Sequence, residues 1–129
     1  MWMTVDASFT NGVAGIAAVV WENSPQESKS KPVFVVGERV AAVSIMEAEY
    51  KALMLAVQLA KDGEITVQTD SKNIADSVQT LNGMNEWTQK HNINLRCVWA
   101  ARGDNSVADA FASIAYRRGS FYVSMKGQP

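Results

Sequence analysis

Three apolar runs dominate the first third of the chain, and polar or turn-forming residues separate them. Runs of this length that are rich in β-branched and aromatic residues predict β-strands. The pair Asn11-Gly12 joins the first two runs and is a strong signal for a tight hairpin. The polar, proline-containing stretch Asn23–Lys31 predicts a loop before the third run. The pattern therefore predicts an antiparallel meander of strands at Met3–Phe9, Val13–Trp21 and Pro32–Val40, with close packing at Gly15.

The next stretch changes to the composition and spacing of a helix. Ser44–Lys61 is rich in Ala, Leu, Met, Glu and Lys, with Ser44 at the N-cap position, Glu47 three residues later and Gly63 just after its end. The elements expected beyond it are a strand at Ile65–Thr69, a helix at Ser71–Leu81, a short helix near Glu86–Lys90, a strand at Ile93–Ala100 and a last helix at Ser106–Arg118.

This order of elements indicates a fold class. A meander followed by alternating helices and strands implies an α/β protein with a mixed five-stranded sheet and helices on both faces. The chain shows no internal repeat, low-complexity segment or linker, so we expect one domain over residues 1–129. The aromatic pair Phe121 and Tyr122 near the C-terminus leaves two alternatives: it packs on the core, or it forms an extra strand.

Composition excludes several classes of protein without identifying a function. The 129 residues carry a net charge of −1, which argues against a strongly basic nucleic-acid grip, although local basic residues can still bind nucleic acid. The single cysteine, Cys97, makes neither an internal disulfide nor a cysteine-based zinc site. The N-terminus does not resemble a signal peptide, and no apolar run approaches the ~20 residues of a membrane span. We therefore expect a cytoplasmic protein without membrane contact.

Four acidic residues stand where a charge is hard to explain, and three of them have simple alternatives. Asp6 lies inside the first predicted strand, where the alternative is an exposed strand face. Asp70 ends the fourth predicted strand, where an aspartate often caps the following helix and stabilises it by about 1 kcal/mol. Asp109 borders the apolar stripe of the last helix, where the alternative is a boundary residue that reaches solvent. Each of these three residues is a weak signal by itself.

Glu49 is the most informative of the four. At about 100° per residue, it falls near the middle of the apolar face of the Ser44–Lys61 helix, between Ala56 and Ala60. Its neighbour Glu47 falls on the polar side of the same helix. An unpaired charged carboxylate on the apolar face would cost several kcal/mol or become protonated. Since no nearby basic residue shares that face, we expect Glu49 to serve a function.

Together the four acids predict a cation site. We expect them to converge near one sheet, where each close pair of carboxylates would repel by roughly 4 kcal/mol at an effective dielectric constant of about 20. Protonation or a multivalent cation relieves that repulsion. Because the donors are oxygens without cysteine or paired histidine, the set favours Mg²⁺ or Mn²⁺ over zinc. A common use of two such ions is in-line displacement at a phosphodiester.

Four stretches of the sequence carry a recognisable ordered set of motifs: VDASFTNGVAGIAAVVW at 5–21, MEAEYKALMLAVQLA at 46–60, ITVQTDSKNIADSV at 65–78 and GDNSVADAFASIA at 103–115. Taken in order, they resemble the type 1 ribonuclease H family in its short form, which lacks a basic protrusion. The resemblance covers most of the chain, and the ordered set is more specific than any single stretch.

The resemblance implies a ribonuclease H-like fold and an enzyme that hydrolyses the RNA strand of RNA/DNA hybrids, leaving 5′-phosphate and 3′-hydroxyl ends. It implies that the four acids are catalytic and hold two Mg²⁺ ions, which Mn²⁺ could replace. Asp6 would bridge both ions. Asp109 would help hold the ion that activates water, and Glu49 with Asp70 the ion that stabilises the leaving oxygen. The expected partner is the hybrid, with no obligatory protein partner.

The sequence departs from the family pattern in its loop, at the start of its long helix and in its length. The loop VWAARGDN at 98–105 lacks the histidine that relatives often carry there, and Arg102 or Asp104 stands as its replacement. Ile45 and Met46 occupy the place of two asparagines that usually read the minor groove. The chain also has no room for the basic protrusion with which some relatives hold the hybrid.

Polar residues beside the acids are the candidates for substrate binding, with ordinary solvated surface residues as the alternative. Because few of them are basic, we expect weak binding that depends strongly on salt. Two other functions stay open: a non-catalytic nucleic-acid or protein-binding module of the same fold, and a nuclease of that fold acting on another duplex or a junction. The candidate binding residues are Ser8 and Asn11 after Asp6, Ser71, Lys72 and Asn73 after Asp70, and Arg102.

Overall fold

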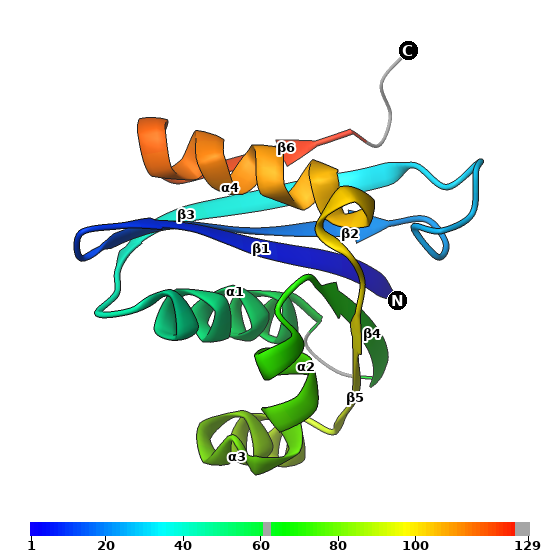
Figure 1. Ribbon diagram of the computed structural model, residues 1–129. Helices are drawn as coiled ribbons and strands as arrows, with labels where there is room; N and C mark the ends of the chain where they lie inside the picture. The colour runs from blue at the N-terminus through cyan, green and yellow to red at the C-terminus, as the bar shows by residue number, and fades with distance from the viewer. Residues whose placement is uncertain (61–62, 126–129) are drawn as a thin grey trace.

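The computed structural model describes residues 1–60 and 63–125, and its strands form one mixed sheet in the order β5-β4-β1-β2-β3-β6. β1, β2 and β3 pair antiparallel, whereas β4 is parallel to both β1 and β5. The main helices, α1 and α4, lie on opposite faces of this sheet (Figure 1). The strands are β1 (Trp2–Thr10), β2 (Val13–Trp21), β3 (Pro32–Ala41), β4 (Gly63–Thr69), β5 (Ile93–Trp99) and β6 (Phe121–Ser124).

The predicted meander is confirmed, and β2 has the predicted bounds. The turn between β1 and β2 has positive φ angles at Asn11 (45°) and Gly12 (84°), which is the backbone conformation that an Asn-Gly hairpin adopts. β1 also pairs with β4 on its other side. The first strand of the chain therefore lies inside the sheet, between β2 and β4.

The predicted count of five strands is wrong, because Phe121–Ser124 forms β6, antiparallel to β3 at the edge of the sheet. This is the extra-strand alternative for the C-terminal aromatic pair. Gly37 of β3 makes room for it: a Cβ built there would lie 2.3 Å from a ring carbon of Phe121. A segment of 4 residues is too short for its periodicity to distinguish a strand from a loop.

The predicted long helix is α1 (Ile45–Ala60), and Ser44 caps it as predicted, because the Glu47 N–H donates to the Ser44 hydroxyl at 3.1 Å. The predicted end of this helix at Lys61 lies outside the described residues. None of the described helices is both long and apolar enough to cross a membrane. The other helical elements are α2 (Lys72–Ser77) and the 3₁₀ turn η1 (Val78–Thr80), which divide the predicted Ser71–Leu81 helix, then α3 (Asn82–Lys90), η2 (Arg102–Asn105) and α4 (Ser106–Arg118).

The main core lies between the sheet and α1, where side chains such as Leu53 are fully buried. α4 covers the other face over a smaller apolar cluster that includes Val19 and Ala108. α4 approaches β2 so closely that a Cβ built at Gly15 would lie 2.2 Å from the carbonyl oxygen of Ala112. The close packing predicted at Gly15 is confirmed, and this contact sets the distance between the sheet and the helix that carries one of the four acids.

Candidate active site

Asp6 and Asp70 come together because their strands are parallel neighbours. Val5 of β1 is paired with Thr69 of β4, and Asp6 and Asp70 are the residues that follow them. Asp6 is buried, with 7% of its surface exposed. The side chain of Asp70 is 10% exposed. The carboxyl group just after the end of β4 thus lies beside the one in the middle of β1, where little water reaches them.

The interpretation of Asp70 as a helix cap is wrong. The N-cap of α2 is Ser71, whose hydroxyl accepts a hydrogen bond from the Ile74 N–H at 3.3 Å. The carboxylate of Asp70 instead faces Arg102, with 3.8 Å between Oδ2 and Nε. The side chain of Arg102 is 89% exposed, so this ion pair is open to solvent and weak. Asp70 is therefore not explained by the stability of α2.

Glu49 approaches the same place from α1. It is half-buried on the face of α1 that carries the buried residues Ala52 and Leu53, as its helical position predicted. Burial raises the pKa of Glu49 above its ordinary 4.5, a hydrogen bond from Ser71 lowers this pKa, and the charge of Asp70 raises it again. The Ser71 side chain therefore links the start of α2 to Glu49.

Asp6 is the most perturbed of the four acids. Its pKa is raised to about 8, first by burial and next by repulsion from Asp70. The Ala7 N–H donates to Oδ1 of Asp6 at 2.8 Å, and this hydrogen bond lowers the pKa of Asp6. A hydrogen bond with Asp109 and the charge of Asp109 add to the rise in the pKa of Asp6. Asp6 thus has two acid neighbours, one just after β4 and one on α4.

Asp109 lies in the first turn of α4 and is exposed. This agrees with the alternative that it is a residue at the border of the apolar stripe that reaches solvent. A carboxylate in that turn also complements the helix dipole. Asp109 nevertheless lies close enough to raise the pKa of Asp6. For Asp70, burial is the largest cause of a raised pKa, the charge of Arg102 lowers this pKa, and the charge of Asp109 raises it. The structure therefore brings all four acids into one electrostatic cluster.

A buried polar contact holds η2 and the start of α4 against the strands that carry Asp6 and Asp70. Asn105 is 2% exposed, and its Nδ2 donates to the carbonyl of Val5 at 2.8 Å. Gln68 of β4 is equally buried, and its Nε2 donates to the carbonyl of Asp104 at 3.1 Å and to Oδ1 of Asn105 at 3.4 Å. We call these two side chains the Gln68–Asn105 clamp. The sequence interpretation missed the clamp, although a glutamine inside an apolar strand was a signal for it.

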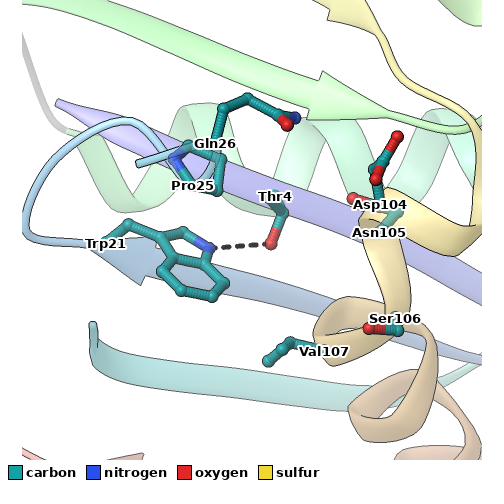
Figure 2. A pocket seen from close by; sticks show the side chains of 8 residues that line it. All are labelled: Thr4, Trp21, Pro25, Gln26, Asp104, Asn105, Ser106 and Val107. Carbon is teal, nitrogen blue, oxygen red and sulfur yellow. Dashed lines mark hydrogen bonds between the residues drawn. The ribbon is translucent and has the colours of Figure 1, made fainter. Parts of the chain in front are cut away.

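A pocket of about 320 Å³ lies beside the clamp and is lined in part by Asn105 (Figure 2). Trp21 forms one wall and donates from Nε1 to the Thr4 hydroxyl at 3.0 Å. Gln26, which approaches from the β2–β3 loop, donates to the side-chain carbonyl of Gln68 at 2.8 Å. None of the four acids lines this pocket. The acid cluster is therefore separate from it.

The candidate substrate-binding residues have different surroundings. Lys72 and Asn73 are exposed at the start of α2, and Arg102 is exposed at the start of η2. Asn11 is exposed in the hairpin turn that its backbone explains. The remaining two are less accessible: Ser8 is half-buried on β1, and Ser71 is buried as the cap of α2. Their roles in binding stay predictions.

The donor set fits a hard divalent cation by its chemistry. The acids supply only oxygen, and raised pKa values at three of them show that burial and mutual repulsion disfavour their charged forms. Within the described part of the chain, however, no three His, Cys, Asp or Glu side chains are already arranged to hold an ion. The carboxyl groups would therefore have to move closer together around a cation.

Solved structures share this fold. An RNase H1, LC11-RNase H1 in complex with an RNA/DNA hybrid, aligns with a TM-score of 0.76 at 19% identity over 91% of this chain and 96% of its own. RNase H1 from Halobacterium salinarum aligns with a TM-score of 0.70 at 18% identity over 88% of this chain and 95% of its own. The N-terminal RNase H domain of rv2228c from Mycobacterium tuberculosis aligns with a TM-score of 0.63 at 18% identity over 90% of this chain and 99% of the other chain.

Sequence comparison supplies the family. No curated protein matches the sequence significantly. A model of the family described as reverse transcriptase-like matches residues 4–115, which include all four acids. The likeness to the RNase H structures, each below 20% identical, shows the fold of the chain. The chain belongs to the reverse transcriptase-like family and has the ribonuclease H-like fold.

Proposed function

We propose that this protein is a metal-dependent nuclease that hydrolyses the RNA strand of RNA/DNA hybrids. The observation that carries the proposal is the cluster of Asp6, Glu49, Asp70 and Asp109 beside the middle of β1 and the end of β4. A stable protein gains nothing from collecting four carboxylates there, because burial and repulsion raise the pKa of three of them. The hybrid as substrate follows the family resemblance and the complex of the similar RNase H1.

The four acids would hold two Mg²⁺ ions, and Mn²⁺ would substitute for them. When bound, such ions activate a water for attack and stabilise charge on the leaving oxygen, which gives 5′-phosphate and 3′-hydroxyl products. Asp6 has acid neighbours just after β4 and on α4, which would suit a ligand shared between both ions. Glu49 and Asp70 would hold the ion on the leaving-group side, and Asp109 the ion on the water side.

The other residues around the cluster would bind and orient the substrate. Lys72, two residues after Asp70, and Arg102, which faces Asp70, are exposed cations and would contact backbone phosphates. Ile45 and Met46, both more than a third exposed at the start of α1, offer apolar contacts in place of amide hydrogen bonds. Substrate binding would be weak and would depend strongly on salt concentration. A KM that does not change with salt concentration would contradict this.

Two observations favour a second candidate, a non-catalytic binding module of the same fold. No set of three acids among the described residues is preformed for an ion, and the asparagine pair of relatives is replaced. Such a module would bind nucleic acid without cleaving it. A nuclease that acts on another duplex or on a junction would instead cleave that substrate and leave the hybrid intact.

A cleavage assay on three substrates separates these functions. End-labelled RNA/DNA hybrid, duplex RNA and duplex DNA are incubated with the protein in Mg²⁺ or Mn²⁺, beside Asp70→Asn and the control Asp76→Asn, an exposed acid on α2. We expect metal-dependent cleavage of the hybrid that Asp70→Asn abolishes and Asp76→Asn retains. Absence of cleavage on every substrate would reject both enzyme functions. Cleavage that survives Asp70→Asn would reject the proposed site.

A further inference from the structure

Trp99 is an exposed aromatic residue held against the acid cluster. It ends β5 opposite Thr69 of β4, and 53% of its surface is exposed. Its indole N–H donates to the main-chain carbonyl of Asp70 at 3.2 Å. The ring is therefore tied to the residue that carries one of the four carboxyl groups, while much of its surface is open to solvent.

Packing does not explain this ring. Leu95 and Cys97, the preceding residues on the same side of β5, both pack against the main core. Trp99 continues that side but belongs to neither apolar cluster of the described residues. The backbone around it is fixed, because the Ala100 N–H donates to the Thr69 carbonyl at 2.9 Å. A ring on a fixed backbone loses little conformational freedom when it binds a ligand.

The charges near Trp99 indicate what kind of ligand would meet it. Arg102 follows three residues later and is almost fully exposed, and Lys72 is exposed just after Asp70. An aromatic face in the same region as two exposed cations suits a nucleotide, because the cations contact phosphates and the ring contacts an apolar face. In a duplex the paired bases are stacked inside, so the apolar face that remains accessible is that of the sugar.

We propose that Trp99 binds the nucleic-acid substrate, with its indole against the sugar face of a backbone nucleotide next to the acid cluster. The inference rests on the proposed function, because it takes nucleic acid as the ligand. Trp99 supplies contact area that does not depend on salt, beside phosphate contacts that do. This contact would compensate in part for the weak electrostatic attraction between nucleic acid and a chain with a net charge of −1.

Binding without cleavage tests the proposal. The protein is titrated with blunt-ended hybrid and with hybrid that carries a single-stranded overhang, with divalent cations chelated, and Kd is measured by anisotropy. Trp99→Ala should raise Kd for both ligands by about tenfold, as expected for loss of an aromatic nucleotide contact. Trp99→Phe keeps a ring but loses the N–H donor to Asp70, and should bind within about twofold of the wild type. An equal loss in both variants would overturn the proposal, because it would assign the effect to the hydrogen bond.

Two further readouts exclude a merely structural role. The slope of log Kd against log salt should be unchanged in Trp99→Ala, whereas Lys72→Ala should lower it by about one. Tyr122→Ala, an exposed aromatic at the opposite edge of the sheet, should leave Kd unchanged. Hybrid should quench tryptophan fluorescence in the wild type but not in Trp99→Phe. Persistent quenching in Trp99→Phe, or an effect confined to the overhang ligand, would overturn the sugar contact.

The inference and the proposed function fail in different ways. If the wild type cleaves hybrid and Trp99→Ala binds it with unchanged Kd, the role of Trp99 is rejected and the nuclease stands. If no substrate is cleaved but the binding pattern of the Trp99 variants holds, the nuclease is rejected and the contact stands.

Discussion

The side-chain amide of Asn105 donates a 2.8 Å hydrogen bond to the main-chain carbonyl of Val5, which lies 100 residues earlier in the chain. The residue after Val5 is Asp6, and four residues after Asn105 comes Asp109. One buried bond therefore joins the two segments that must be aligned for these acids to meet. Gln68, two residues before Asp70, supports the same junction through Asp104 and Asn105.

Removing the clamp should affect both stability and the site. Asn105→Ala leaves the buried Val5 carbonyl without its partner and should lower the free energy of unfolding by about 1–3 kcal/mol. Because the start of α4 would lose this contact with β1, hybrid cleavage should also fall, by about tenfold or more. Urea unfolding and a cleavage assay measure the two effects. Asn94→Ala, an exposed residue on β5, is the control. Wild-type values for both measurements in Asn105→Ala would contradict the role of the clamp.

Gly15 should not tolerate a side chain. A Cβ at this position would lie 2.2 Å from two backbone atoms of α4, so Gly15→Ala must push the helix away from β2. We expect a loss of about 1–3 kcal/mol in the free energy of unfolding. Gly103→Ala is the matched control, because a Cβ there meets nothing within 4 Å. Equal unfolding midpoints for the two variants would show that α4 does not depend on this contact.

Stability in the absence of divalent cations should decrease as pH rises. The pKa of Asp6 is raised from 3.8 to about 8 in the folded state, so between these values the folded chain binds a proton that the unfolded chain has lost. The stabilisation is complete below the unfolded value and is lost as pH rises through the folded one, by up to about 1.4 kcal/mol per pH unit for one proton. Glu49 and Asp70, whose pKa values are also raised, act in the same direction.

Chemical denaturation at a series of pH values measures this dependence. Asp6→Asn cannot ionise and should flatten the profile, while the exposed Asp76→Asn should keep the wild-type slope. A wild-type chain that becomes more stable across that interval, with chelator present, would show that the acids are not coupled as described.

Divalent cations should stabilise the folded chain, since the proposed site would bind them and the unfolded state offers no such site. At Mg²⁺ concentrations about tenfold above its Kd, one site adds about 1.4 kcal/mol to the free energy of unfolding. Thermal unfolding with Mg²⁺ or chelator should therefore show a higher Tm with the ion, and a smaller shift in Asp109→Asn. The same shift in both proteins would remove Asp109 from the ligand set.

Local pattern in the sequence was sufficient for much of the fold. The bounds of β2 and α4 were predicted because apolar spacing over nine or more residues distinguishes a strand from a helix. The same geometry predicted Glu49 on the apolar face of α1, since a helix repeats every ~3.6 residues whatever surrounds it. A carboxylate there indicated a site before any tertiary contact was known.

Only the tertiary structure decided how distant segments meet. The capping of α2 by Ser71 rather than Asp70 depends on the path of the chain out of β4, and both residue types are good caps. β6 exists because β3 offers it an edge and Gly37 offers space. The contact of Asn105 with Val5, and the ring of Trp99 at Asp70, join residues far apart in the chain. Such contacts are set by packing and register, which no short window of sequence contains.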